Sequence, residues 1–150
     1  MATPDSLRLL LDHARKQTDD AAINLGKLSL KQQEAEKTLQ LLVEYRKNYQ
    51  SQFMGSAGSG INPAEWRNFK AFICKLDTAI QAQQKLVTIT QEHKEAGSRQ
   101  YYAHRLKLKS YVTLSQRADL HHQTYLQKQE QRQLDEHTAH NFSKQQKNTD

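Results

Sequence analysis

The sequence has 150 residues, of which 36% are hydrophobic, and a formal net charge of +6, and its mean hydropathy is −0.92. This composition is lean for a globular core and is typical of a chain that buries a narrow seam between long helices. It excludes a membrane-spanning helix, because no apolar run is long enough, and an internal disulfide, because Cys74 is the single cysteine. The first residues lack the basic and apolar regions of a signal peptide, so we expect a cytoplasmic protein without direct membrane insertion.

A first helix is predicted from about residue 4 to residue 54. Thr3 is a typical cap residue, Pro4 suits the first helical position, and Asp5 places a carboxylate near the positive end of the helix dipole. Two mostly apolar stripes then recur at heptad spacing, which is typical of a coiled coil. The first stripe is Leu7, Ala14, Ala21, Leu28, Ala35, Leu42 and Tyr49, and the second is Leu11, Thr18, Leu25, Gln32, Leu39, Arg46 and Phe53.

A glycine-rich hinge is predicted at 55–62, the one cluster of turn-forming residues in the sequence. Asn62, Pro63 and Glu65 then form a cap, a first helical residue and a capping-box glutamate, which predicts a second helix over about 63–141. Its two stripes continue the heptad spacing. They are Trp66, Ile73, Ile80, Val87, Lys94, Tyr101 and Leu108, followed by Phe69, Leu76, Gln83, Thr90, Gly97, His104 and Tyr111.

These elements predict an all-α protein, a long two-helix antiparallel coiled coil or helical hairpin. Pairing the stripes outward from the hinge sets Tyr49 opposite Trp66 and Gln32 opposite Gln83. We assign residues 1–142 to a single hairpin domain. Beyond about residue 110 the second helix has no partner segment, so it should protrude as a lone C-terminal helix, and residues 143–150 should be disordered.

The apolar surface near the hinge is wider than one seam requires. A two-stranded coil covers only its two stripes, so Tyr45, Phe72, Ala79 and Leu86 should stay at least partly exposed. Exposed aromatic side chains at helical spacing indicate a surface for a protein partner or for a second copy of the chain.

A basic segment in the second helix contains no acidic residue between its ends and is interleaved with tyrosines. Its members are Arg99, Arg105, Lys107, Lys109 and Arg117. We favour a protein partner with an acidic surface, because the net charge is modest and no nucleic-acid motif is present. A nucleic-acid-binding coiled coil that uses the same residues is the alternative.

Residues for catalysis, a cofactor or a metal are not evident. The sequence has no phosphate-binding loop and no nucleophile with a matching base. The histidine pairs His121–His122 and His137/His140 lack the further ligands that a metal site needs. We therefore expect a protein that is not an enzyme and has no cofactor and no small-molecule substrate.

Short groups of residues stand in a defined order on both sides of the hinge. They are Asp19–Ala22, Leu25–Gly26, Gln33 with Ala35–Glu36, then Leu39, Leu42, Tyr45 and Tyr49, then Gly60–Ile61, then Trp66, Asn68, Phe69, Phe72, Ile73, Leu76 and Ala79–Ile80, and finally Thr113–Leu114, Arg117 and Asp135–Glu136. From about Leu7 to His140, this order resembles the flagellar export protein FliJ family.

The resemblance implies a non-enzymatic component of the flagellar type III export apparatus, with a coiled coil similar to the central stalk of rotary ATPases. It implies that such a protein promotes assembly of the export ATPase ring, links the ring to the export gate membrane protein, and helps recycle export chaperones. It would lie in the cytoplasm, peripherally associated with the inner membrane at the flagellar base. The equivalent stalk of a virulence type III secretion system is a further alternative.

The resemblance also assigns site residues. It places the gate-binding surface at Leu42, Tyr45, Tyr49, Phe72, Leu76 and Ala79. The heptad pattern instead buries Leu42, Tyr49 and Leu76 in the seam. Residues in the seam of a two-stranded coil keep one side open, so they could belong to the seam and to the gate-binding surface at once. Alternatively, the stripe on the first helix is rotated by one position. The basic segment becomes the candidate contact with the ATPase ring.

Overall fold

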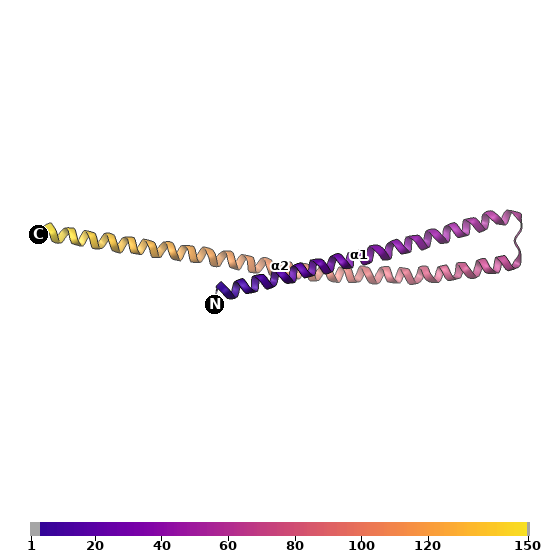
Figure 1. The fold of residues 1–150 in the computed structure, drawn as a ribbon, viewed down its shortest axis with the longest axis horizontal. Coiled ribbons are helices and arrows are strands. Elements are labelled where there is room, and N and C mark those ends of the chain that lie inside the picture. The colour runs from indigo at the N-terminus through magenta and orange to yellow at the C-terminus, as the bar shows by residue number, and fades with distance from the viewer. Residues whose placement is uncertain (1–3, 150) are drawn as a thin grey trace. The chain divides into compact units, whose positions relative to one another are not determined.

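The computed structural model describes residues 4–149, which form two long helices joined by a short turn (Figure 1). Helix α1 spans Pro4–Ser56, a 3-10 turn η1 spans Ala57–Ser59, and helix α2 spans Pro63–Thr149. Each proline is the first residue of a helix, where its missing amide hydrogen removes no intrahelical hydrogen bond. No strand occurs among the described residues, and the all-α prediction is confirmed. The predicted cap at Thr3 lies outside the described residues.

The hinge contains the turn chemistry that the sequence predicts. Gly60 has a φ of 93°, a left-handed value that a side chain would strain, and its amide donates to the Ala57 carbonyl at 3.3 Å. The Asn62 side-chain oxygen accepts a hydrogen bond from the Ala64 amide at 3.2 Å, and the Trp66 amide donates to the Asn62 carbonyl at 3.1 Å. Asn62 is thus the cap of α2, as predicted.

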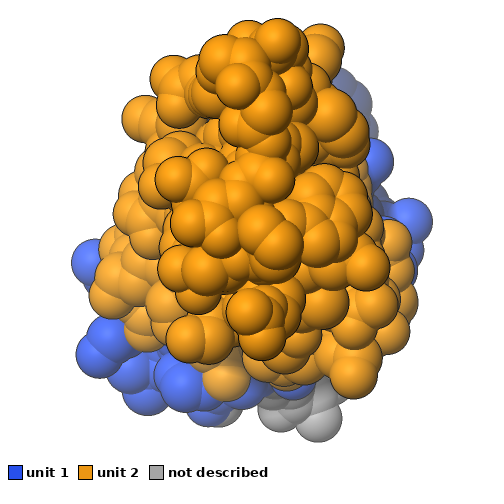
Figure 2. All heavy atoms as spheres, turned by 90° about the vertical axis from the view of Figure 1, so that its right-hand side faces the viewer, with its two compact units in different colours: residues 1–16, 105–150 blue, residues 17–104 orange. Residues whose placement is uncertain are grey.

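Contacts divide the chain into two compact units (Figure 2). Unit 2, Gln17–His104, contains the hinge, and within it α1 and α2 run antiparallel side by side (Figure 1). We call it the hairpin unit. Unit 1 contains residues 4–16 of α1 and 105–149 of α2, and its half-buried side chains include Leu7, Leu11, Leu108 and Tyr111. The assignment of residues 1–142 to a single domain stays a prediction.

The two heptad stripes are the buried surface of the hairpin unit. Every predicted seam position between Gln17 and His104 is buried or half-buried, except Trp66 beside the hinge, which is 39% exposed. Leu76 is 8% exposed and Tyr49 is half-buried, whereas Tyr45, outside the stripes, is 52% exposed. The stripe on α1 is therefore not rotated, and the seam assignment from the heptad pattern is confirmed.

The pairing across the seam differs from the prediction. Tyr49 stacks on Phe69, with ring centroids 5.6 Å apart, and Gln83 Nε2 donates to the Ala35 carbonyl at 2.9 Å; the expected partners of these residues were Trp66 and Gln32. These two contacts join the first stripe of α1 to the second stripe of α2. Side chains lean toward the N-terminus of their own helix, so in an antiparallel pair they meet partners that lie farther along α2 than the backbone level suggests.

Gly97 lies where the two helices come close together. It is buried, and a Cβ built on it would lie 2.6 Å from Leu28 Cδ1. Gly26, by contrast, is exposed and has no atom within 4 Å of such a Cβ. Gly97 therefore has a packing role inside a continuous helix.

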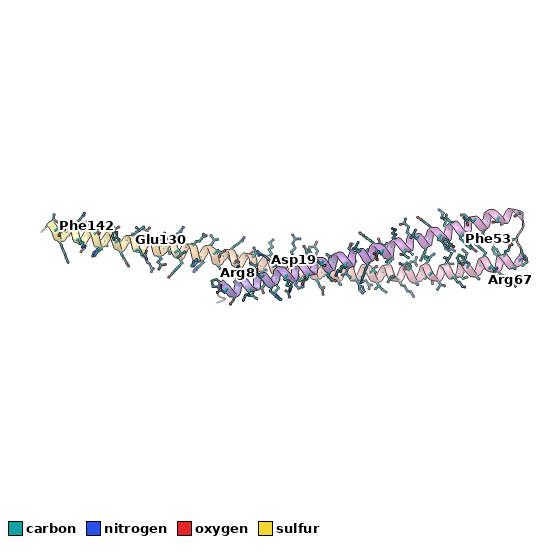
Figure 3. The ribbon with its side chains drawn as sticks, viewed as in Figure 1. Arg8, Asp19, Phe53, Arg67, Glu130 and Phe142 are labelled. Atoms are coloured by element: carbon teal, nitrogen blue, oxygen red, sulfur yellow. The ribbon has the colours of Figure 1, made fainter. Side chains whose placement is uncertain are left out.

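Within residues 4–149, no helix packs against the C-terminal part of α2. All residues from 116 to 149 are exposed, including Glu130 and Phe142 (Figure 3). This part is the C-terminal helix expected beyond the hairpin. Its end differs from the expected disordered tail at 143–150, because α2 continues through residues 143–149. That segment contains neither proline nor glycine, and its glutamines and lysines are good helix formers.

Gly26→Ala and Gly97→Ala form a matched pair of substitutions. Each gains about 1 kcal/mol of helix propensity, but at Gly97 the new methyl group forces Leu28 to move. We expect Gly26→Ala to stabilise the protein by about that amount and Gly97→Ala to stabilise it by clearly less, or to destabilise it. Urea denaturation followed by circular dichroism measures both. Equal stabilisation by the two substitutions would contradict the close packing at Gly97.

Candidate functional site

Six aromatic rings gather beside the hinge in the hairpin unit. Tyr45, Tyr49 and Phe53 come from α1, and Trp66, Phe69 and Phe72 come from α2. They meet because α1 ends and α2 begins with aromatic side chains at positions on or next to the heptad stripes. We call these six residues the hinge aromatic cluster.

The inner rings of the cluster belong to the folded core. Phe53 stacks on Phe69 with centroids 3.9 Å apart and an interplanar angle of 9°, and Phe69 is 7% exposed. Such ring pairs contribute about 0.5–1.5 kcal/mol beyond the burial of their surface. This stack therefore joins the end of α1 to the start of α2.

The outer rings lie at the surface. Tyr45 meets Phe72 edge-on with centroids 6.2 Å apart, and Tyr49 contacts Phe72 at 4.6 Å. Tyr45 is exposed and Phe72 is half-buried, as the width of the apolar stripe predicts. Ala79, one heptad beyond Phe72, is exposed on the same flank of the seam. We call Tyr45, Tyr49, Phe72 and Ala79 the aromatic face.

The structure thus places the six residues assigned to gate binding in two layers. Tyr45, Tyr49 and Phe72 are in direct ring contact. Ala79 is exposed, whereas Leu42 is half-buried and Leu76 is buried in the seam. A surface built this way exposes rings whose positions are held by the packing of the seam.

The opposite flank of the seam is polar. Arg46 Nε lies 2.6 Å from Asp77 Oδ1, and Gln91 Nε2 donates to Glu36 Oε1 at 3.5 Å. In the heptad, Asp77 and Gln91 stand on the side of the stripes that Phe72 does not occupy. The Arg46–Asp77 pair is part-exposed, so its contribution to stability is modest. The two flanks therefore differ: one carries polar links between the helices and the other carries exposed rings.

The basic segment lies entirely on α2, and all of its members are exposed. Arg99 belongs to the hairpin unit, while Arg105, Lys107, Lys109 and Arg117 belong to unit 1. None occupies a seam position, and none forms an ion pair within residues 4–149. The structure therefore leaves their charges available to a partner, although it does not gather them on a single helix face.

No candidate metal-binding site is present in the part of the chain that the structure describes. No group of three or more His, Cys, Asp or Glu side chains there could hold a metal ion. His137 Nε2 lies 3.3 Å from Asn141 Nδ2 on the same helix, and Cys74 is exposed. In the same residues, neither helix has a stretch long and apolar enough to cross a membrane.

Known proteins match this chain over most of its length. The family model described as "Flagellar FliJ protein" matches residues 4–147. The chain belongs to the flagellar FliJ family. The FliJ family is part of the flagellar export apparatus, so the resemblance found in the sequence is confirmed at this level.

Two relatives carry the same family description. A "Flagellar FliJ protein" of Salmonella typhi is 31% identical over 117 residues, which are 78% of this chain and 80% of that protein. A "Flagellar FliJ protein" of Escherichia coli (strain K12) is 36% identical over 93 residues, which are 61% of this chain and 63% of that protein. No solved structure matches the chain.

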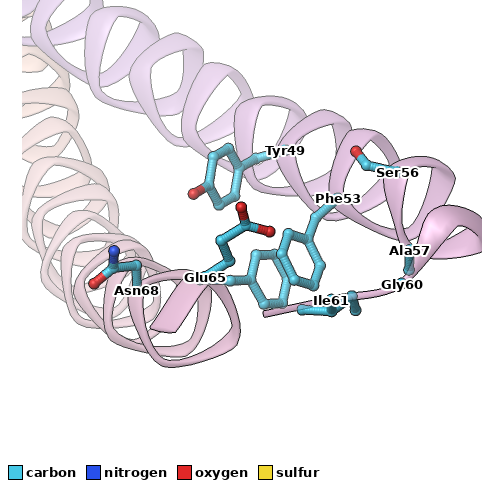
Figure 4. A pocket seen from close by; sticks show the side chains of 9 residues that line it. Tyr49, Phe53, Ser56, Ala57, Gly60, Ile61, Glu65 and Asn68 are labelled. Carbon is cyan, nitrogen blue, oxygen red and sulfur yellow. The ribbon is translucent and has the colours of Figure 1, made fainter. Parts of the chain in front are cut away.

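The structure of this FliJ-family chain also contains a feature that the sequence pattern does not reveal, a cavity of about 280 Å³ at the hinge. It opens between the end of α1 and the start of α2 (Figure 4). Its lining residues are Tyr49, Phe53, Ser56, Ala57, Gly60, Ile61, Glu65, Asn68 and Phe69. Aromatic residues on both sides of the glycines are the feature of the sequence that could have indicated this cavity. The heptad pattern assigns Tyr49, Phe53 and Phe69 to the seam alone.

Substitutions of an inner ring and of an outer ring of the hinge aromatic cluster should lower the free energy of unfolding by different amounts. We expect Phe69→Ala to cost about 3 kcal/mol, because it removes the buried ring that stacks on Phe53. Tyr45→Ala should cost less than about 1 kcal/mol, since it removes an exposed ring whose contacts with Tyr49 and Phe72 lie at the surface. Thermal and urea denaturation measure both free energies. Comparable losses would place Tyr45 in the core and contradict its role as a surface residue.

Proposed function

We propose that this FliJ-family protein is a non-enzymatic, stalk-like component of the flagellar type III export apparatus and that its aromatic face binds the export gate membrane protein. The observation that carries the proposal is the exposed contact of Tyr45 with Phe72, which bridges α1 and α2. Both residues are among the gate-binding residues that the family resemblance implies.

The physics of the aromatic face favours a protein partner. Tyr45 is exposed, so packing within this chain does not account for its apolar ring. Aromatic side chains that are rigidly held yet exposed supply much binding energy, because little conformational entropy is lost when they are covered. Tyr49 and Phe72 hold the Tyr45 ring in place through their contacts with it. A partner surface that covers the three rings would bury them together.

The family resemblance supplies the remaining roles of the proposal. According to these roles, the protein promotes assembly of the export ATPase ring, links that ring to the gate, and helps recycle export chaperones. The basic segment on α2 is the proposed contact with acidic groups of the ATPase ring, because its five charges are exposed. We place the protein in the cytoplasm, peripherally associated with the inner membrane at the flagellar base.

Removing either ring of the Tyr45–Phe72 contact tests gate binding. Tyr45→Ala and, separately, Phe72→Ala should weaken binding to the purified cytoplasmic domain of the export gate protein by about tenfold or more. Isothermal titration calorimetry measures the affinity, and circular dichroism shows whether the helices persist. Tyr125→Ala is the matched control, since Tyr125 is 58% exposed on the C-terminal part of α2. Unchanged affinity in Tyr45→Ala, or loss of its fold, would overturn the assignment.

Reversing the charges of the basic segment tests its role. The triple variant Arg105→Glu, Lys107→Glu and Lys109→Glu should bind the export ATPase more weakly, and its affinity should depend less on salt than that of the parent protein. Binding is measured at low and at physiological salt by surface plasmon resonance.

A control with the same change in net charge is Lys128→Glu, Arg132→Glu and Lys144→Glu, which alters exposed residues farther along α2. An equal effect of both variants would indicate only a response to net charge. Tight binding of the parent protein to unrelated DNA or RNA in a gel shift would favour the nucleic-acid alternative instead.

A further inference from the structure

The hinge cavity combines aromatic rings with one acidic group. Phe53 and Phe69 form one stacked wall, and Tyr49 stacks on Phe69 beside it. The Glu65 carboxylate enters from the start of α2 and points toward the space next to the Tyr49 ring (Figure 4). Asn68 adds an amide to the lining. The cavity therefore offers ring surface and a negative charge in one place.

The carboxylate of Glu65 has no counter-ion among the described residues, where Arg46 and Asp77 form the one ion pair. The two cations close to it in sequence are engaged elsewhere. Arg67 Nε donates to the Pro63 carbonyl at 3.3 Å, and Lys70 Nζ lies 5.3 Å from the centroid of the Trp66 ring. Glu65 is exposed at the start of α2, and a cationic group from another molecule can therefore reach its carboxylate without displacing an ion pair.

We propose that the hinge cavity binds the guanidinium group of an arginine side chain from a partner protein. A guanidinium ion is planar, stacks on aromatic rings and forms paired hydrogen bonds with a carboxylate, so it matches both features of the lining. The volume of about 280 Å³ lies just below the usual range for drug-sized ligands and suits a single side chain. The contact of Lys70 with Trp66 shows that rings of the same cluster already hold a cation.

This site is separate from the proposed gate contact in its chemistry. It depends on Glu65, which lies at the hinge and outside the aromatic face, and it selects a cation rather than apolar surface. Tyr49 alone belongs to both. The inference therefore does not rest on the identity of the gate as a partner, and either proposal can fail without the other.

The test uses the full chain and N-acetyl-arginine N′-methylamide as the probe. Trp66 is the single tryptophan and contacts Phe53 and Phe69, which line the cavity, at centroid distances of 5.9 Å. Saturable changes in Trp66 fluorescence, with amide shifts at Phe53, Asn68 and Phe69 in NMR spectra, are the expected result. The matched probe is the citrulline derivative, which has almost the same shape but no charge, at the same ionic strength.

Glu65→Gln supplies the decisive variant, because it keeps the side-chain shape and removes the charge. It should weaken binding of the arginine probe about tenfold or more, while Glu92→Gln, at another exposed glutamate of α2, should leave binding unchanged. Thermal denaturation of each variant shows that the hairpin is intact. Equal binding of the arginine and citrulline probes, or unchanged binding by Glu65→Gln, would overturn the proposal.

Discussion

The stack of Phe53 on Phe69, with centroids 3.9 Å apart, holds the two helices together next to the turn that reverses the chain. A pair of helices buries only one narrow stripe, so few large side chains in this protein are deeply buried. Those that are, Phe69, Leu76 and Ile80, all lie on α2 in the part that follows the hinge. The other buried hydrophobic residues, Ala14 and Ala35, are small and contribute less apolar surface. Cohesion of the hairpin unit is therefore concentrated near the hinge.

This concentration gives the exposed aromatic face a rigid support, because the face lies in the same place. A ring presented to a partner needs a rigid support, and the hinge end supplies one through its stacked phenylalanines and Leu76. Farther from the hinge, Gln83 forms a side-chain hydrogen bond across the seam, and Gly97 allows the helices to approach closely. Both residues bury little apolar surface. The two flanks of the seam are specialised as well. Polar links such as Arg46–Asp77 occupy one flank, so an apolar partner can approach the other without breaking them.

Much of the fold follows from local rules that a sequence displays. The heptad repeat marks which side chains are buried, and the prolines with Asn62 mark where the helices begin, because both effects depend on residues close together in the chain. The axial pairing of the helices does not follow as directly. It depends on how side chains lean across the seam and on the path of the turn, so Tyr49 meets Phe69 rather than the expected Trp66. The exposure of Tyr45 and Phe72 could be predicted, whereas the hinge cavity could not, because it exists only once the turn has brought Glu65 beside Tyr49.

The exposed end of α2 has a consequence for the thermodynamics of any association through this segment. Residues 116–149 bury no side chain, yet they continue a helix that starts at Pro63. Starting a helix is the costly step, whereas extending one adds a hydrogen bond for each residue that is ordered. The earlier part of α2 therefore acts as a preformed nucleus for the exposed part. A partner that binds there meets a segment that grows from an existing helix, and the ordering entropy that opposes association is smaller than it would be for the same segment as a free peptide.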